Sequence, residues 1–166
     1  MKILILFILL LPAGVSMAQD STSFYILKYS TPRSASEAFF NKKLDGQYTF
    51  SYHLNPFYLR GDFNGDKMND IIIPVKEKAT GKIGLAVVHS GIGEVYILGA
   101  GNTFNDIDDF REFNIWSVVT ESSFKSHWEK KSLKLNSEAI SIGVFECTGA
   151  IIYWDGKKYC WYQMAD

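Results

Sequence analysis

The segment Asp70–Val75 places the strongest constraint on the fold, because the three consecutive isoleucines Ile71–Ile73 leave it without a polar face. An apolar, β-branched run of this length is typical of a strand that is buried on both faces. Pro74 has no N–H group to donate to a neighbouring strand, which predicts an edge or a bulge on one side of the strand at that position.

Turn signals after this strand predict a meander. Lys78–Gly81 is expected to form a turn, after which residues 82–89 return antiparallel. Ser90–Gly93 turns again before a third strand over residues 94–98. Residues 99–109 are rich in Gly, Asn and Asp, so they are expected to form a long loop.

A second group of strands is expected in the C-terminal third of the chain. Residues 113–120 and 138–146 are candidate strands, the second of them with an apolar face. Residues 150–154 and 157–162 flank Asp155-Gly156, a dipeptide typical of a tight two-residue type I′ hairpin turn.

One helix is predicted, over residues 33–44, because Thr31-Pro32 is typical of a helix start and Asp45-Gly46 of a helix end. Residues 19–30 are expected to be a leader or a first strand. The predicted fold class is therefore α+β, dominated by antiparallel meander sheets, with one N-terminal helix.

The first 18 residues have the pattern of a secretory signal peptide. Lys2 precedes the apolar run Ile3–Val15, and small residues follow at Ser16 and Ala18. The run is too short to cross a hydrocarbon layer of about 30 Å as a helix. We therefore expect cleavage after Ala18, a periplasmic or secreted location, and no membrane contact after cleavage.

The remaining residues, 19–166, suit a single domain of ordinary size, and the sequence contains no internal repeat. The formal net charge of the whole chain is −1, which gives no electrostatic reason to expect a nucleic acid as partner.

The motif with the clearest chemistry is the acidic loop over residues 62–70. Calcium takes six to eight oxygen ligands at about 2.3–2.6 Å, and alternate residues of a tightly curled loop can point inward together. The oxygen donors of this loop are the side chains of Asp62, Asn64, Asp66 and Asp70 and the main-chain carbonyl of Met68. The sequence therefore predicts one Ca2+ ion here, although an Asx-rich turn without an ion is an alternative.

The string Gly-Asp-Phe-Asn-Gly-Asp, followed by an apolar strand, resembles the calcium loop of FG-GAP repeats, the blades of integrin-alpha-type β-propellers. The resemblance covers residues 58–75 and implies the same five ligands, Asp62 to Asp70. Lys67 departs from the glycine usual at the sixth loop position. Only one copy of the loop is present, which excludes a closed propeller.

The whole chain also resembles a group of exported bacterial proteins that combine such a loop with a later Gly-rich segment and a terminal hairpin. The matching stretches are Val95–Gly101 and Ala150–Gln163. This second resemblance implies an architecture and no activity.

Cys147 and Cys160 are the only cysteines, and an oxidising compartment would allow them to pair. With turns at Thr148-Gly149 and Asp155-Gly156, they would lie on strands separated by a third, about 9–10 Å apart. A disulfide needs Cα atoms within about 7 Å. Either the register differs or both thiols are free.

Two further regions are candidate partner surfaces. Paired carboxylates from the Gly-rich loop could in principle serve a glycosidase, and the aromatic residues of the terminal hairpin could meet a glycan or a protein. The residues concerned are Asp106, Asp108, Asp109, Trp154 and Trp161.

No catalytic constellation is evident in the sequence. The histidines lack the spacing of zinc ligands, and Ser90 lacks the glycine pattern of a nucleophile elbow. The leading hypothesis is an exported, non-catalytic module with a structural calcium ion and an unknown protein or glycan partner. The alternatives are a hydrolase of envelope polymers and an inhibitor or immunity-type protein.

Overall fold

The computed structural model describes residue 22 and residues 25–126 and 131–164. The expected signal peptide, residues 1–18, lies outside the described residues. In the described part of the chain, no helix is both long enough and apolar enough to cross a membrane.

Two helical segments precede the strands. Residues 25–30 are helical, so of the two alternatives expected for residues 19–30, a leader or a first strand, the strand is wrong for this part. The exposed rings of Tyr25 and Tyr29 stack with centroids 6.0 Å apart, while Leu27 is buried. Side chains four residues apart share one side of a helix, which explains this division into an exposed and a buried face.

Helix α2, Arg33–Asn41, confirms the predicted helix and ends slightly earlier than expected. Ala35, Ala38 and Phe39 form its buried face. Lys43 adopts a positive φ of 57°, which ends the α-helical path before the short 3-10 helix η1, Leu44–Gly46.

The first sheet has the strand order β1-β3-β4-β5, and β2 pairs with the same edge of β3 as β1. All its pairs are antiparallel, and the meander predicted from residue 70 onward is confirmed. The strands are β1 (Tyr48–Phe50), β2 (Leu59–Gly61), β3 (Asp70–Glu77), β4 (Ile83–His89) and β5 (Glu94–Gly99).

Pro74 lies opposite the gap between β1 and β2, as predicted for a residue without an N–H group. β2 pairs with β3 as far as Leu59 and Ile72, and β1 pairs with it from Phe50 and Val75. The carbonyl of Pro74 accepts a hydrogen bond from the Ser51 N–H at 2.9 Å, beyond the end of β1. The missing donor therefore costs no ladder bond.

The second sheet has the strand order β11-β10-β9-β6 and is also antiparallel. A two-stranded ribbon, β7 with β8, lies beyond it. These strands are β6 (Ile115–Val119), β7 (Ser123–Phe124), β8 (Leu133–Lys134), β9 (Ala139–Val144), β10 (Thr148–Trp154) and β11 (Tyr159–Gln163).

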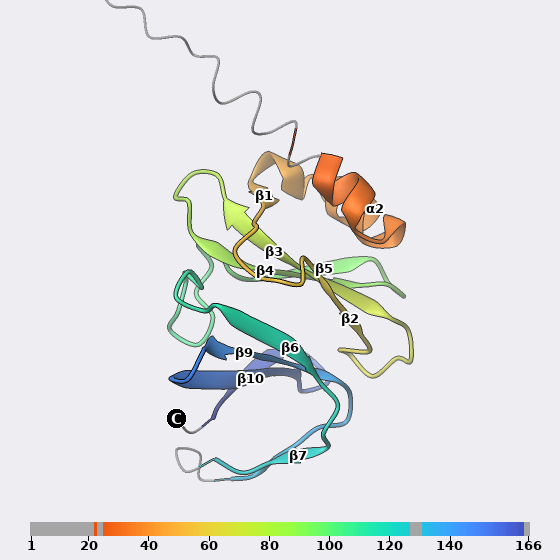
Figure 1. Cartoon of the computed structure of the whole chain (residues 1–166). Coiled ribbons are helices and arrows are strands. Elements are labelled where there is room, and N and C mark those ends of the chain that lie inside the picture. Colours follow the sequence, from red (N-terminus) through yellow and green to blue (C-terminus); the bar gives the residue numbers. More distant parts are fainter. Residues whose placement is uncertain (1–21, 23–24, 127–130, 165–166) are drawn as a thin grey trace, which may run out of the picture.

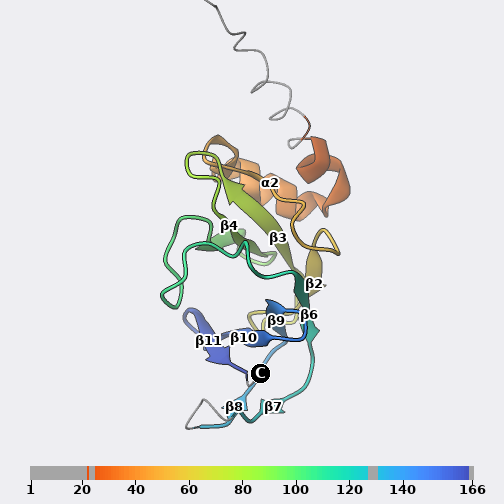
Figure 2. The same cartoon turned by 60° about the vertical axis from the view of Figure 1, so that its left-hand side comes forward.

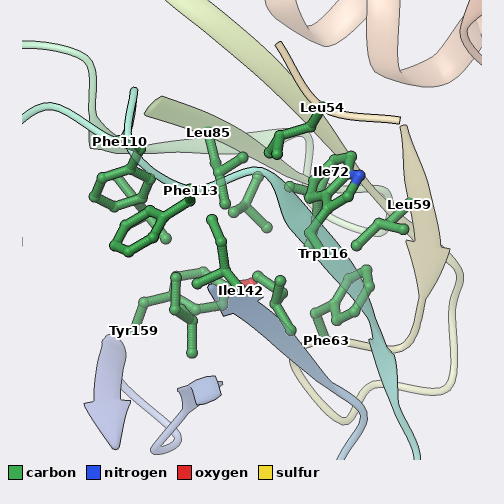
Figure 3. Close-up of a cluster of buried hydrophobic side chains, with 14 residues drawn as sticks. Leu54, Leu59, Phe63, Ile72, Leu85, Phe110, Phe113, Trp116, Ile142 and Tyr159 are labelled. Carbon is green, nitrogen blue, oxygen red and sulfur yellow. The ribbon is translucent and has the colours of Figure 1, made fainter. Parts of the chain in front are cut away.

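The elements stack in four layers, with α2 outside the first sheet, the second sheet on its other face, and the β7–β8 ribbon last (Figures 1 and 2). Ile71 and Ile73 of β3 pack with the helix, whereas Ile72 faces the second sheet. The inter-sheet core includes Phe63 and Trp116, as Figure 3 shows. Both faces of β3 are buried, as its sequence predicts.

The predicted fold class is confirmed: the protein is β-dominated with antiparallel sheets, and the described strands close into neither a barrel nor a propeller. The helical segment at residues 25–30 adds a second helix to the one expected.

The predicted two-residue turn at Asp155-Gly156 is wrong, because Trp154 pairs with Tyr159 and leaves a four-residue loop. The Oδ1 atom of Asp155 accepts the N–H groups of Lys157 and Lys158 at 2.8 and 2.9 Å. This side-chain capping holds the longer loop.

Cys147 and Cys160 are both free. Thr148-Gly149, predicted as a turn, instead begins β10. Cys160 lies opposite Tyr153, near the other end of β10 from Cys147, so about 20 Å of strand separates the two. This register excludes a bond between them.

Candidate metal centre

The acidic loop connects two strands that pair at its base. β2 ends at Gly61 and β3 begins at Asp70, and these two residues lie opposite each other in the antiparallel ladder. The residues between them must reverse direction over a short distance, so the loop curls tightly.

Asp62 folds its carboxylate back over the loop. Its Oδ1 atom accepts a hydrogen bond from the Gly65 N–H at 2.7 Å, and its Oδ2 atom accepts one from the Lys67 N–H at 3.0 Å. Asp62 therefore organises the main chain of the loop from its first position.

Asn64 and Asp66 continue this inward arrangement. The Asn64 Oδ1 atom accepts the Asp66 N–H at 3.0 Å, and the Asp66 Oδ1 atom accepts the Met68 N–H at 2.7 Å. The Asn64 amide also donates to the Asp66 Oδ2 atom at 3.1 Å. The alternating polar side chains thus face the loop's own backbone.

Two residues of the loop adopt positive φ angles. Gly65 has a φ of 83°, and Lys67, at the position where the FG-GAP pattern has glycine, has a φ of 68°. The backbone at residue 67 therefore has the left-handed conformation that glycine favours. A residue with a Cβ atom adopts this conformation at a cost of about 1–2 kcal/mol.

Asp70 is the one loop carboxylate that is fully buried, with 0% of its surface exposed. Its two oxygens accept the N–H groups of Phe63, at 3.1 Å, and Ser90, at 3.0 Å. Burial, helped by the charges of Asp66 and Asp62, raises the pKa of Asp70 to about 6 against the opposing effect of the hydrogen bonds from Ser90 and Phe63. The ionised carboxylate is therefore under-compensated where it lies.

The turn between β4 and β5 packs against the loop. The hydroxyl of Ser90 donates to the carbonyl of Asn69. A Cβ atom at Gly91 would lie 2.9 Å from both the Asp66 Oδ2 and the Met68 Sδ atoms. The turn therefore lies directly against these two side chains, and a larger residue at position 91 would require them to shift.

Glu138, just before β9, contacts the loop from the second sheet. Its Oε2 atom accepts the Asp62 N–H at 2.6 Å, and its own N–H donates to the Asp62 carbonyl at 3.0 Å. The Ser137 hydroxyl donates a long hydrogen bond, of 3.5 Å, to the Phe63 carbonyl. The loop is thus held by contacts from both sheets.

The donor set of the loop suits a hard divalent cation. Three carboxylates, the Asn64 amide oxygen and the Met68 carbonyl are oxygen donors of the kind that calcium takes. Among the described residues, no three His, Cys, Asp or Glu side chains form a ready metal-binding group. A site in this loop would therefore need the Asn64 and Met68 oxygens as well as the carboxylates.

The second acidic segment is engaged in other contacts. The Lys82 ammonium forms an ion pair with Asp108. The Asp109 carboxylate accepts the Ile83 N–H at 3.0 Å and pairs with the Arg111 guanidinium at 2.5 Å. Asp106 is exposed and has a positive φ of 63°. Two of these three carboxylates thus hold the loop to the start of β4 and to Arg111.

The two hairpin tryptophans pack against the inter-sheet core and are only partly exposed. The Trp154 ring lies 5.1 Å from those of both His89 and Tyr159. The Trp161 ring lies 5.9 Å from that of Phe113. Both side chains therefore pack the hairpin against the inter-sheet core and remain partly exposed.

Sequence reasoning missed Glu138 and the supporting role of Ser90 and Gly91. Glu138 is far from the loop along the chain and carries no motif, so no signal in the sequence pointed to it. The resemblance of residues 58–75 to FG-GAP loops stays a prediction. No protein-family model, curated protein or solved structure matches the chain.

Proposed function

We propose that the protein is an exported, non-catalytic module in which the Asp62–Asp70 loop binds one structural calcium ion. The ligands would be the side chains of Asp62, Asn64, Asp66 and Asp70 and the carbonyl of Met68. A bound ion would supply positive charge to the carboxylates and would join the ends of β2 and β3.

The buried carboxylate of Asp70 carries this proposal. A fully buried acid beside two other acids is unfavourable unless a cation or a proton compensates it. Burial and the charges of Asp66 and Asp62 raise its pKa to about 6, which means that its charged form is disfavoured. A divalent cation bound by these acids together with the Asn64 and Met68 oxygens is the compensation that the composition of the loop suits best.

Calcium suits the loop better than magnesium. Magnesium demands near-ideal octahedral geometry and keeps several of its waters, whereas calcium accepts a flexible set of carboxylate, amide and main-chain oxygens. The loop offers such a mixed set from one short segment.

An ion in this loop would act through stability. Free calcium at 100 times its dissociation constant would add about 2.7 kcal/mol to the free energy of unfolding. The surface proposed for a protein or glycan partner is the loop around Asp106 together with the exposed edges of Trp154 and Trp161. The ion pairs of Asp108 and Asp109 support a structural role for these two carboxylates rather than a catalytic one.

Equilibrium dialysis against calcium tests the proposal. We expect one calcium ion per chain and a dissociation constant that rises at least about tenfold in Asp66→Asn, because ligand charge sets calcium affinity. Asp66 is exposed, so the variant should fold. The matched control is Asp45→Asn, at an exposed acid outside the loop, which should leave the affinity unchanged.

Absence of bound calcium at millimolar concentration would refute the proposal, and so would an Asp66→Asn variant that binds as tightly as the parent. The loop would then be an Asx-rich turn without an ion. Magnesium in the same dialysis should compete only weakly.

A further inference from the structure

The contact between Glu138 and Asp62 joins the acidic loop to the second sheet. The Asp62 N–H donates to the Glu138 carboxylate at 2.6 Å, and the Glu138 N–H donates to the Asp62 carbonyl at 3.0 Å. One acceptor is a carboxylate, which makes that bond stronger than a bond between neutral groups. Asp62 is therefore fixed by a residue of the other sheet.

The fit around this carboxylate is close. A Cβ atom at Gly61 would lie 2.6 Å from the Glu138 Oε2 atom, so only glycine leaves the carboxylate in place. Glycine at position 61 thus admits a side chain from the second sheet to the first residue of the loop.

Phe63, which follows Asp62, also links the loop to the core between the sheets. The Phe63 side chain is 1% exposed and belongs to the inter-sheet cluster, beside Trp116 in Figure 3. Its N–H group donates to the Asp70 carboxylate. The first and last acids of the loop are thus both tied to the contact between the sheets.

We propose that Glu138 is a positioning residue for the calcium loop and that calcium binding is therefore coupled to the packing of the two sheets. This inference rests on the proposed function, since it concerns the same ion. Glu138 fixes the main chain of Asp62, whose carboxylate in turn orders the N–H groups of Gly65 and Lys67. Hydrogen-bonding partners of metal ligands commonly change metal affinity 10- to 100-fold.

The coupling must act in both directions. If sheet packing favours the loop conformation that binds calcium, then calcium favours the packed sheets by the same free energy. A bound ion would stabilise the contact between the start of β9 and the β2–β3 loop, and its removal would weaken the packing of the two sheets at that end.

Calcium affinity of Glu138 variants is the first test. Equilibrium dialysis should show an affinity about 10- to 100-fold weaker in Glu138→Ala. Glu138→Gln should lose less, because its amide oxygen can still accept the Asp62 N–H. Glu121→Ala, a matched change at an exposed acid, should bind as the parent does. Equal affinity in all the variants would overturn the proposal.

Hydrogen exchange, read by mass spectrometry, is the second test, and its first comparison uses the parent protein alone. Calcium should slow exchange in β9, Ala139–Val144, as well as in β3. At saturating calcium, Glu138→Ala should keep the effect in β3 and lose it in β9.

Protection confined to residues 61–77 would overturn the coupling and leave the calcium site itself intact. A parent protein that binds no calcium in dialysis would overturn both the site and the coupling. The two failures are therefore distinguishable.

Discussion

Asp70 shows how one residue links the strand to the loop. It begins β3, its backbone faces Gly61 across the ladder, and its carboxylate receives N–H groups from the loop and from the β4–β5 turn. An apolar residue there would leave both N–H groups without an acceptor. A buried acid instead satisfies both groups, so the loop, β3 and the β4–β5 turn are joined through one side chain. The same carboxylate would be a ligand of the proposed calcium ion.

Lys67 is the residue at which the acidic loop departs from the FG-GAP pattern, which usually has glycine at this position. Because its φ is 68°, Lys67→Gly should remove about 1–2 kcal/mol of backbone strain and lose about 0.5–1 kcal/mol to chain entropy. We expect a net gain of several tenths of a kcal/mol in the free energy of unfolding, measured by urea titration in EDTA.

The same change should tighten calcium binding several-fold, since it also removes a positive charge beside the acids. Lys157→Gly is the control, at an exposed lysine whose φ is not positive, and it should be destabilising. Destabilisation of similar size in both variants would show that the backbone at residue 67 is not strained.

At the scale of elements, the strands of the first sheet are set by their own sequences. The double-sided apolar run predicts β3, the turn signals predict the returns to β4 and β5, and Pro74 marks a break in the neighbouring edge. These features are local, which is why the sequence predicts them. The terminal turn is different, because both a two-residue turn and the observed four-residue loop begin with Asp155-Gly156, and the Asp155 side chain favours the longer one.

Gly84 tests the pairing of β4 with β5. A Cβ atom there would lie 2.2 Å from the Leu98 carbonyl oxygen and 2.4 Å from the Ala100 nitrogen. Both atoms belong to the backbone and cannot rotate away, so Gly84→Ala should lower the free energy of unfolding by about 1–3 kcal/mol or more.

Gly46→Ala is the matched control, because no atom lies within 4 Å of its added Cβ. It should be neutral or stabilising by about 0.4–1 kcal/mol. Urea unfolding of both variants gives the comparison. A Gly84→Ala midpoint equal to that of the parent would mean that β4 and β5 pair differently.

At the scale of the whole molecule, the acidic loop lies where the two sheets meet. The sequence predicts the loop and its oxygen donors, since they lie in one short segment at every second position. It does not predict Glu138, because the contact depends on how β9 is placed against β2, and this placement follows from packing between distant segments. The same reason explains why the two cysteines could not be assigned before the register of β10 was known.

Thermal unfolding of the purified protein, in excess EDTA and then in millimolar calcium, tests the central claim most directly. For a gain of about 2.7 kcal/mol, we predict a rise in Tm of about 5–10 °C with calcium. Asp66→Ala should show no such rise, and the control Asp45→Ala should show all of it. A Tm that is the same with EDTA and with calcium, or an equal rise in Asp66→Ala, would contradict a structural calcium ion in this loop.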